Sequence, residues 1–166
     1  MERGRKGWRE GVRAGNGHFR APPPVVRMIR RMQGLHLTAD LHGCLPTGQA
    51  RAAMTDAAAL RRLCMDAVRS SGLAPVGELF HRFEAAAEAT QPPGVTGVVL
   101  LAESHLAVHT WPELGAVTLD VYVCNFGADN SQRAHMLLDA LLAAFAPAHA
   151  QRHEIARGAR TPVAPA

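Results

Sequence analysis

Residues 102–113 read AESHLAVHTWPE and carry more polar chemistry than an ordinary core strand does. This segment holds a serine hydroxyl, two histidines and two carboxylates, and the thiol of Cys124 follows a little later. Apolar runs flank it on both sides. Nucleophilic and proton-transferring side chains gathered in this way favour a catalytic site.

The apolar runs beside this segment have the two-residue period of β-strands. Residues 94–102 form one run, residues 105–110 continue in an extended pattern, and a turn at Pro112 and Gly115 leads into residues 116–124. In that last run valines and a leucine alternate with polar residues, and Cys124 is on the polar side. This position favours a functional role for Cys124 over simple core packing.

The rest of the chain adds three strands and two helices. Strands are predicted over 35–41, 73–83 and 148–156. Apolar residues at helical spacing predict one helix that begins at Thr55 and ends at Gly72, and another from about 129 to 147. We therefore expect an α+β two-layer sandwich, an antiparallel β-sheet with two helices packed on one face.

The chain of 166 residues is the size of a single domain. Its net charge of +4 is uneven, because nine of the 18 basic residues and only two of the 14 acidic ones lie in residues 1–33. We predict a disordered basic extension over 1–33, a folded domain over 34–158 and a flexible tail over 159–166. Because Lys6 is the only lysine in the chain, the basic charge indicates a coding bias toward arginine rather than a nucleic-acid-binding patch, and no nucleic-acid partner is expected.

Apolar runs are too short for a membrane span or a secretion signal, so a cytoplasmic protein that does not bind membranes is expected. The three cysteines, Cys44, Cys64 and Cys124, lack the paired spacing of a metal site and are expected to be free thiols. Cys64 lies on the apolar stripe of the first helix, so we expect it in the core.

The motif ESHxxxHTWPE over 103–113 resembles that of the prokaryotic S-adenosylmethionine decarboxylase proenzymes, and the resemblance extends over about 34–158. It implies that the chain cuts its own backbone between Glu103 and Ser104, giving a β chain up to 103 and an α chain from 104. It also implies that Ser104 becomes a covalent pyruvoyl group, the only cofactor, which forms a Schiff base with S-adenosylmethionine. Such a carboxy-lyase makes the aminopropyl donor for spermidine biosynthesis.

The resemblance also implies roles for other residues. His109 would transfer protons during processing, Thr96 would assist where the family commonly has a serine, and Cys124 would donate a proton in catalysis. The substrate would contact Glu113, Trp111 and Phe83. The sequence departs from the family pattern after Phe83, because residues 84–90 are inserted and Thr90, not Thr96, occupies the usual spacing.

Thr96 and Ser104 are eight residues apart, or about 26 Å along a straight strand, too far to share a site within one extended segment. A two-fold dimer removes this difficulty, because its interface can bring one subunit's Thr96 and His109 to the other's Ser104 and Cys124. The resemblance likewise implies a homodimer with composite sites.

Three alternatives remain open at this point. The same fold and cofactor serve pyruvoyl-dependent decarboxylases of arginine or ornithine, and the unusual spacing after Phe83 favours them while Glu113 favours S-adenosylmethionine. A zinc hydrolase using His105, His109 and Cys124 fits poorly, because histidines four apart on a strand lie about 13 Å apart; no metal is expected. An inactive regulatory relative would keep the fold and remain uncut.

Overall fold

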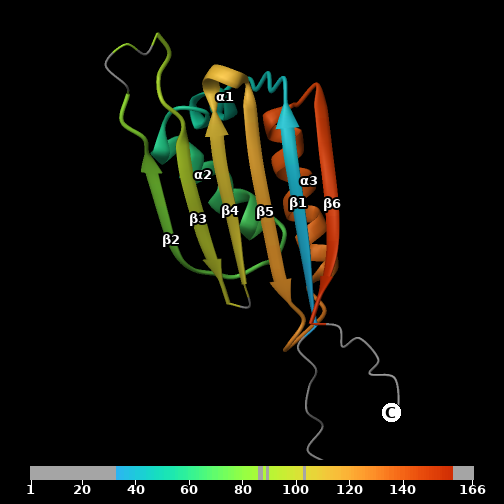
Figure 1. Cartoon of the computed structure of the whole chain (residues 1–166). Coiled ribbons are helices and arrows are strands. Elements are labelled where there is room, and N and C mark those ends of the chain that lie inside the picture. Colours follow the sequence, from blue (N-terminus) through green and yellow to red (C-terminus); the bar gives the residue numbers. More distant parts are fainter. Residues whose placement is uncertain (1–32, 86–87, 89, 103, 159–166) are drawn as a thin grey trace, which may run out of the picture.

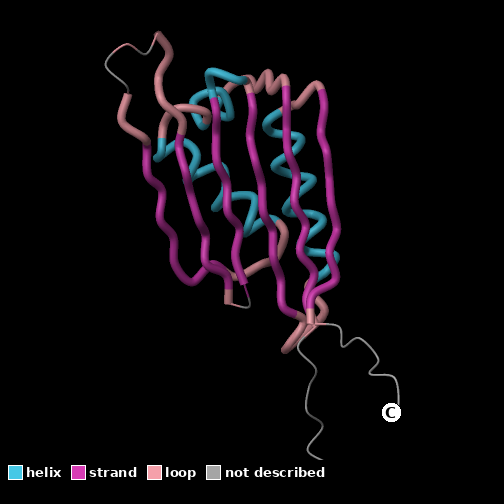
Figure 2. Tube along the Cα trace, in the orientation of Figure 1, coloured by secondary structure: helices cyan, strands magenta, loops and turns pink. Residues whose placement is uncertain are grey.

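The computed structural model describes residues 33–85, 88, 90–102 and 104–158. A single antiparallel sheet forms one layer, and its strand order is β2-β3-β4-β5-β1-β6. The helices form the second layer on one face of the sheet, and within the described residues the other face carries no helix (Figures 1 and 2). The strands are β1 (Gly34–His42), β2 (Pro75–Arg82), β3 (Val95–Leu101), β4 (Ser104–Trp111), β5 (Ala116–Cys124) and β6 (His149–Arg157), and the helices are α1 (Gln49–Ala53), α2 (Ala57–Ser70), the 3₁₀ helix η1 (Pro112–Leu114) and α3 (Ser131–Phe145).

The core lies between the sheet and the two long helices. Each central strand turns alternate side chains toward the helices, as the two-residue period requires. Fully buried examples are Leu41, Val99, Leu106 and Val121 from the strands, and Phe145 from α3. Burying each such side chain contributes about 1.5–3 kcal/mol, so this interface accounts for most of the stability of the sandwich.

The predicted α+β sandwich is confirmed, with two differences in the helices. The helix predicted from Thr55 is capped instead by Asp56, whose Oδ1 accepts a hydrogen bond from the Ala59 N–H at 2.6 Å. A carboxylate at the N-cap also suits the positive end of the helix dipole. The short helix α1 was not predicted. The predicted extension over 1–33, apart from Gln33, and the tail over 159–166 lie outside the described residues.

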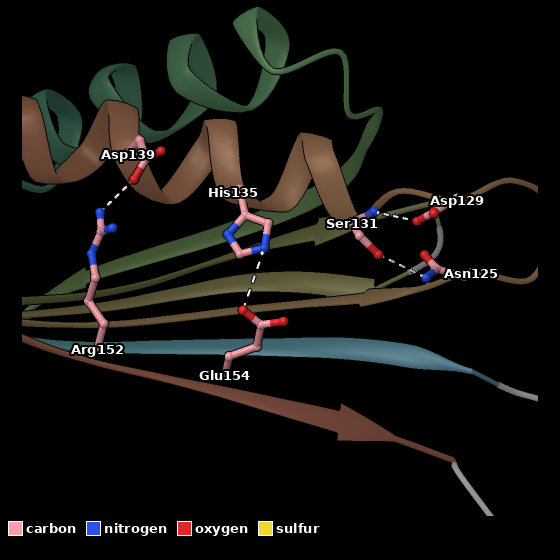
Figure 3. Close-up of polar contacts among 7 residues, drawn as sticks. All are labelled: Asn125, Asp129, Ser131, His135, Asp139, Arg152 and Glu154. Carbon is pink, nitrogen blue, oxygen red and sulfur yellow. Dashed lines mark hydrogen bonds and ion pairs between the residues drawn. The ribbon is translucent and has the colours of Figure 1, made fainter.

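Helix α3 is tied to the sheet edge by polar contacts on its exposed side (Figure 3). Asp139 pairs with Arg152 of β6 at 2.5 Å, and His135 lies 3.7 Å from Glu154. At the start of the helix, Asp129 Oδ1 accepts a hydrogen bond from the Ser131 N–H, which lowers the pKa of Asp129. Exposed pairs of this kind contribute little stability, so they chiefly fix where α3 lies against β6.

All three cysteines are free thiols. Cys64 is fully buried in α2, as predicted, and burial raises its pKa to about 12. Cys44 is also buried, and burial raises its pKa. Cys124 is partly exposed, so it is the thiol with access to solvent. Among the described residues no helix has the length and apolar character needed to cross a membrane.

Candidate active site

The open face of the sheet, on which none of the described helices packs, carries four of the predicted site residues. Thr96 of β3, His109 and Trp111 of β4, and Cys124 of β5 all follow the strand parity that points away from the helices. Ser104 has the opposite parity, since it shares the side of the buried Leu106. These residues fall into two groups, one at each end of β4.

The first group forms around His109. Antiparallel pairing places Thr96 directly opposite His109, and Thr96 Oγ1 lies 2.8 Å from His109 Nδ1. The hydrogen bond fixes the ring orientation and leaves Nε2 free of this contact, as a proton-transferring histidine requires. The structure thus brings the hydroxyl of Thr96 against the ring of His109, and their joint role in processing stays a prediction.

The strand end beyond His109 is anchored by Thr110, which is buried. Its hydroxyl donates to the Met54 carbonyl at 2.7 Å and accepts from the Val95 N–H at 2.8 Å. The backbone of Gly94 passes so close that a Cβ there would lie 1.9 Å from the Thr110 carbonyl oxygen. These contacts fix the last residues of β4 and therefore the position of Trp111 and of the helix η1 that follows it.

A pocket of about 460 Å³ opens at this same end. The three predicted substrate residues, Phe83, Trp111 and Glu113, all line it. Thus the longer spacing after Phe83 does not remove this ring from the pocket. Residues from the inserted segment and its continuation also contribute to the wall, namely Ala85, Glu88, Thr90, Gln91, Pro92 and Pro93.

The second group lies at the start of β4. Ser104 pairs with Leu101 of β3 and with Val123 of β5, so only Ala102 and Glu103 connect β3 to β4. Its Oγ is shielded from solvent and has no hydrogen-bond partner among the described residues. An unpaired buried hydroxyl costs about 1–3 kcal/mol, so its presence calls for an explanation. Glu103 itself lies outside the described residues.

Cys124 lies at this same end, one residue beyond the partner of Ser104. Its Sγ is 3.3 Å from the hydroxyl of Tyr122, which points to the same open face. The hydrogen bond to Cys124 raises the pKa of Tyr122, burial and the thiolate charge add to this, and the nearby charge of Arg157 opposes it. No role was predicted for Tyr122 from the sequence, although it shares the polar side of β5 with Cys124.

The two groups do not meet within one chain. Ser104 and His109 are five residues apart on one strand, which corresponds to about 17 Å. The pocket lies at the His109 end of β4. Within one chain it is therefore also remote from Ser104 and Cys124. Across the described residues, no three His, Cys, Asp or Glu side chains gather closely enough to hold a metal ion.

Residues 35–158 match the family model described as S-adenosylmethionine decarboxylase. The chain belongs to this family. It is 32% identical over 125 residues to the S-adenosylmethionine decarboxylase proenzyme of Hydrogenobaculum sp. (strain Y04AAS1) and 35% identical over 125 residues to that of Aquifex aeolicus (strain VF5); each comparison covers 75% of this chain and 81% of the relative.

The fold agrees with this assignment to the S-adenosylmethionine decarboxylase family. The crystal structure of the Aquifex aeolicus adenosylmethionine decarboxylase matches with a TM-score of 0.64 and 31% sequence identity, over 82% of this chain and 99% of the other. The relatives just described are S-adenosylmethionine decarboxylases by name, so they do not favour the arginine or ornithine alternative.

Proposed function

We propose that this chain is a self-cleaving S-adenosylmethionine decarboxylase that works with a pyruvoyl group made from Ser104. The proenzyme is cut between Glu103 and Ser104. The mature enzyme then removes the carboxylate of S-adenosylmethionine and supplies the aminopropyl donor of spermidine biosynthesis. A cytoplasmic location, expected from the sequence, stays a prediction.

The cut follows from the chemistry of a serine hydroxyl next to a peptide carbonyl. Ser104 Oγ attacks the carbonyl carbon of Glu103, the C–N bond breaks, and an ester joins the two parts of the chain. Removal of the Ser104 Cα proton then breaks the Cβ–O bond, which releases Glu103 as a carboxylate and leaves dehydroalanine. Addition of water and loss of ammonia convert this residue into a pyruvoyl group at the new N-terminus.

The observation that carries the proposal is the state of Ser104. Its hydroxyl is shielded from water and is not held by any described partner, so no hydrogen bond has to break before it attacks. It also lies at the first residue of β4, next to the two-residue connection from β3, where a peptide bond can be opened without breaking the sheet. Ser104 and its surroundings therefore fit a pyruvoyl group formed at this position.

The proton transfers of processing are assigned to His109 and Thr96. Since these residues lie about 17 Å along β4 from Ser104 of the same chain, we propose that they act on Ser104 of a second subunit. The sheet face opposite the described helices carries Thr96, His109 and Cys124 and offers the surface for such a two-fold dimer (Figure 1), while Ser104 would be reached at the end of β4, where its side chain has the opposite parity. Each composite site would combine one subunit's pocket with the other's Ser104 and Cys124.

In the mature enzyme the bound pyruvoyl group supplies an electron sink for the C–COO⁻ bond. The remaining tasks belong to side chains of this chain. Glu113 accepts hydrogen bonds from the ribose hydroxyls, and the rings of Phe83 and Trp111 contact the adenine and exclude water. Cys124 delivers the proton that replaces the lost carboxylate.

The test of the cut compares the intact mass of the wild-type chain with that of Ser104→Ala. We expect two fragments from the wild type, residues 1–103 and a keto-blocked 104–166, and one uncut chain from the variant. A wild type that remains whole while it is fully active, or normal cutting of Ser104→Ala, would overturn the proposal. An inactive regulatory relative would remain whole and release no carbon dioxide.

The test of the substrate measures carbon dioxide release from carboxyl-labelled S-adenosylmethionine, arginine and ornithine. We expect release from S-adenosylmethionine alone. Glu113→Gln should raise KM by about 10-fold or more, because a carboxylate hydrogen bond is lost. Faster release from arginine or ornithine would refute the substrate assignment while leaving the cut intact.

A further inference from the structure

Tyr122 lies at the centre of a group of side chains from four strands on the open face. The imidazole of His36 on β1 meets its ring edge-on with the centroids 5.8 Å apart, and that of His105 on β4 is tilted against it at 5.7 Å. The guanidinium carbon of Arg157 on β6 lies 5.4 Å from its ring centre. Contacts with these three side chains hold the Tyr122 ring in place.

The space for the ring comes from a glycine on the neighbouring strand. Gly34 pairs with Cys124, and a Cβ at Gly34 would lie 2.8 Å from Tyr122 Cε2 and 3.0 Å from the phenolic oxygen. The 2.8 Å distance is shorter than real Cβ contacts, and the same Cβ would lie 2.9 Å from the Val123 carbonyl oxygen, so a larger residue at position 34 would displace the Tyr122 ring and disturb the adjoining backbone of β5. The absence of a side chain there lets the phenol reach toward the thiol.

The contact that results is a hydrogen bond of 3.3 Å between the Tyr122 hydroxyl and Cys124 Sγ. While Cys124 is a thiol, either group can donate. Once Cys124 has given up its proton, only the phenol can donate, and it then bonds to a thiolate. The phenol of Tyr122 is protonated at neutral pH even at its ordinary pKa of about 10, and the hydrogen bond to Cys124 raises this pKa further, so the phenol can donate this bond.

We propose that Tyr122 is a positioning residue that holds Cys124 Sγ and stabilises its thiolate, with Gly34 providing the space and Arg157 supporting the ring. This inference rests on the proposed function of Cys124 as the proton donor. Tyr122 does not touch the substrate in this scheme. It acts by fixing the direction from which Cys124 delivers its proton and by making the deprotonated form less costly.

Other charged and titratable groups near Tyr122 could also affect how the reactivity of Cys124 depends on pH. His36 lies 3.1 Å from Asp120 of β5, and Arg157 Nη1 is 3.3 Å from His36 Nδ1. His105 contacts the Tyr122 ring from β4. A change in the behaviour of Cys124 is therefore assigned to Tyr122 only when these groups remain in place, which a Tyr122→Phe substitution allows.

The test uses the uncut full-length Ser104→Ala chain, so that it needs neither processing nor turnover. The rate at which iodoacetamide alkylates Cys124 is measured against pH by peptide mass spectrometry. Cys44 and Cys64 are buried and serve as internal references. We expect Tyr122→Phe to move the alkylation midpoint upward by about half to one pH unit, because a hydrogen bond to the thiolate is lost.

Three further variants separate positioning from general damage. Gly34→Ala should give a shift in the same direction, because it displaces the ring, and Arg157→Gln should give a smaller one. Thr38→Val removes a hydroxyl from the same face at the register of Asp120, about 13 Å along β5 from Cys124, and should leave the midpoint unchanged. Circular dichroism checks that each variant is folded.

In the cleaved enzyme, Tyr122→Phe should lower kcat by about 10-fold with little change in KM and should alter the pH profile of kcat. An unchanged alkylation midpoint in folded Tyr122→Phe would overturn the inference while the proposed function remained. Conversely, failure of the wild type to cut itself would refute the proposed function, and the alkylation result would still decide whether Tyr122 controls Cys124.

Discussion

The two ends of strand β4 differ in how their polar atoms are satisfied. At the far end, His109 is bonded to Thr96 and the hydroxyl of Thr110 is bonded to two backbone segments, beside a pocket of about 460 Å³. At the near end, Ser104 Oγ is buried and has no partner among the described residues. One end holds its polar side chains in hydrogen bonds, whereas the other leaves a buried serine hydroxyl without a partner among the described residues.

This difference has an energetic meaning. Hydrogen bonds at the far end each contribute about 0.5–1.5 kcal/mol, while the unpaired hydroxyl at the near end costs about 1–3 kcal/mol. A protein tolerates such a cost where the atom has a chemical task. In the proposed dimer, a complete site combines the Ser104 end of one chain with the His109 end of the other.

The largest effect is expected when two inactive variants are combined. Ser104→Ala and His109→Ala, each with a different tag, should remain largely uncut when expressed alone. The first lacks the hydroxyl that attacks the Glu103 carbonyl, and the second lacks a proton-transfer group, whose loss slows a reaction by about 10²–10⁴-fold. Expressed together, they should form mixed dimers in which only the His109→Ala chain is cut. Mass spectrometry of both tagged chains provides the measurement, and a site contained in one chain would leave both whole.

Cys124→Ala should separate processing from catalysis. We expect this variant to be cut, because the hydroxyl of Ser104 and His109 are intact, but to release carbon dioxide about 10²-fold more slowly, since the proton donor is missing. Single-turnover assays on the purified two-chain form measure this loss. A Cys124→Ala enzyme with wild-type kcat would remove Cys124 from the mechanism.

Substitutions of Thr96 test the hydrogen bond at the His109 end of β4. Thr96→Val keeps the shape but removes the hydrogen bond to His109 Nδ1, so cutting should slow by about 10-fold. Thr96→Ser restores a hydroxyl on a side chain with more χ1 freedom and should cut at least as fast as the wild type. The half-time of cutting during in vitro synthesis gives the rates, and equal rates for all three chains would show that the bond is unimportant.

The smallest expected effect concerns a core thiol far from either end. Because burial raises the pKa of Cys64 from about 9 to about 12, the thiol ionises first in the unfolded chain, and stability falls as pH rises between these values. The free energy of unfolding of the wild type should thus approach that of Cys64→Ala above pH 9. Urea unfolding from pH 8 to 11 measures the difference, which a constant gap would contradict.

Much of the fold could be predicted because strand alternation is local. The valine and leucine alternation of β5 predicted both its bounds and the open-face position of Cys124, which the structure confirms. The apolar spacing of α2 likewise predicted the burial of Cys64. The cap was wrong by one residue, because Thr55 and Asp56 are both good N-cap residues and only the backbone decides between them.

The site was harder to predict because it depends on pairing between distant segments. The contact of Thr96 with His109 requires the register of β3 and β4, which no local pattern contains. The side of β4 on which Ser104 lies is predictable from Leu106 and Val108, which are apolar and share that side. Gly34 and Gly94 were further signals, since each marks a place where another group comes too close for a side chain.

The order of strands in the sheet also determines what a cut at Glu103 leaves behind. The first fragment would hold β1, β2 and β3, and the second β4, β5 and β6. Strand β1 of the first fragment lies between β5 and β6 of the second and is hydrogen-bonded to both, so the strands of the two fragments alternate in the sheet. The two products could separate only by breaking the β3–β4, β1–β5 and β1–β6 ladders, so they would stay together as one folded unit after the cut.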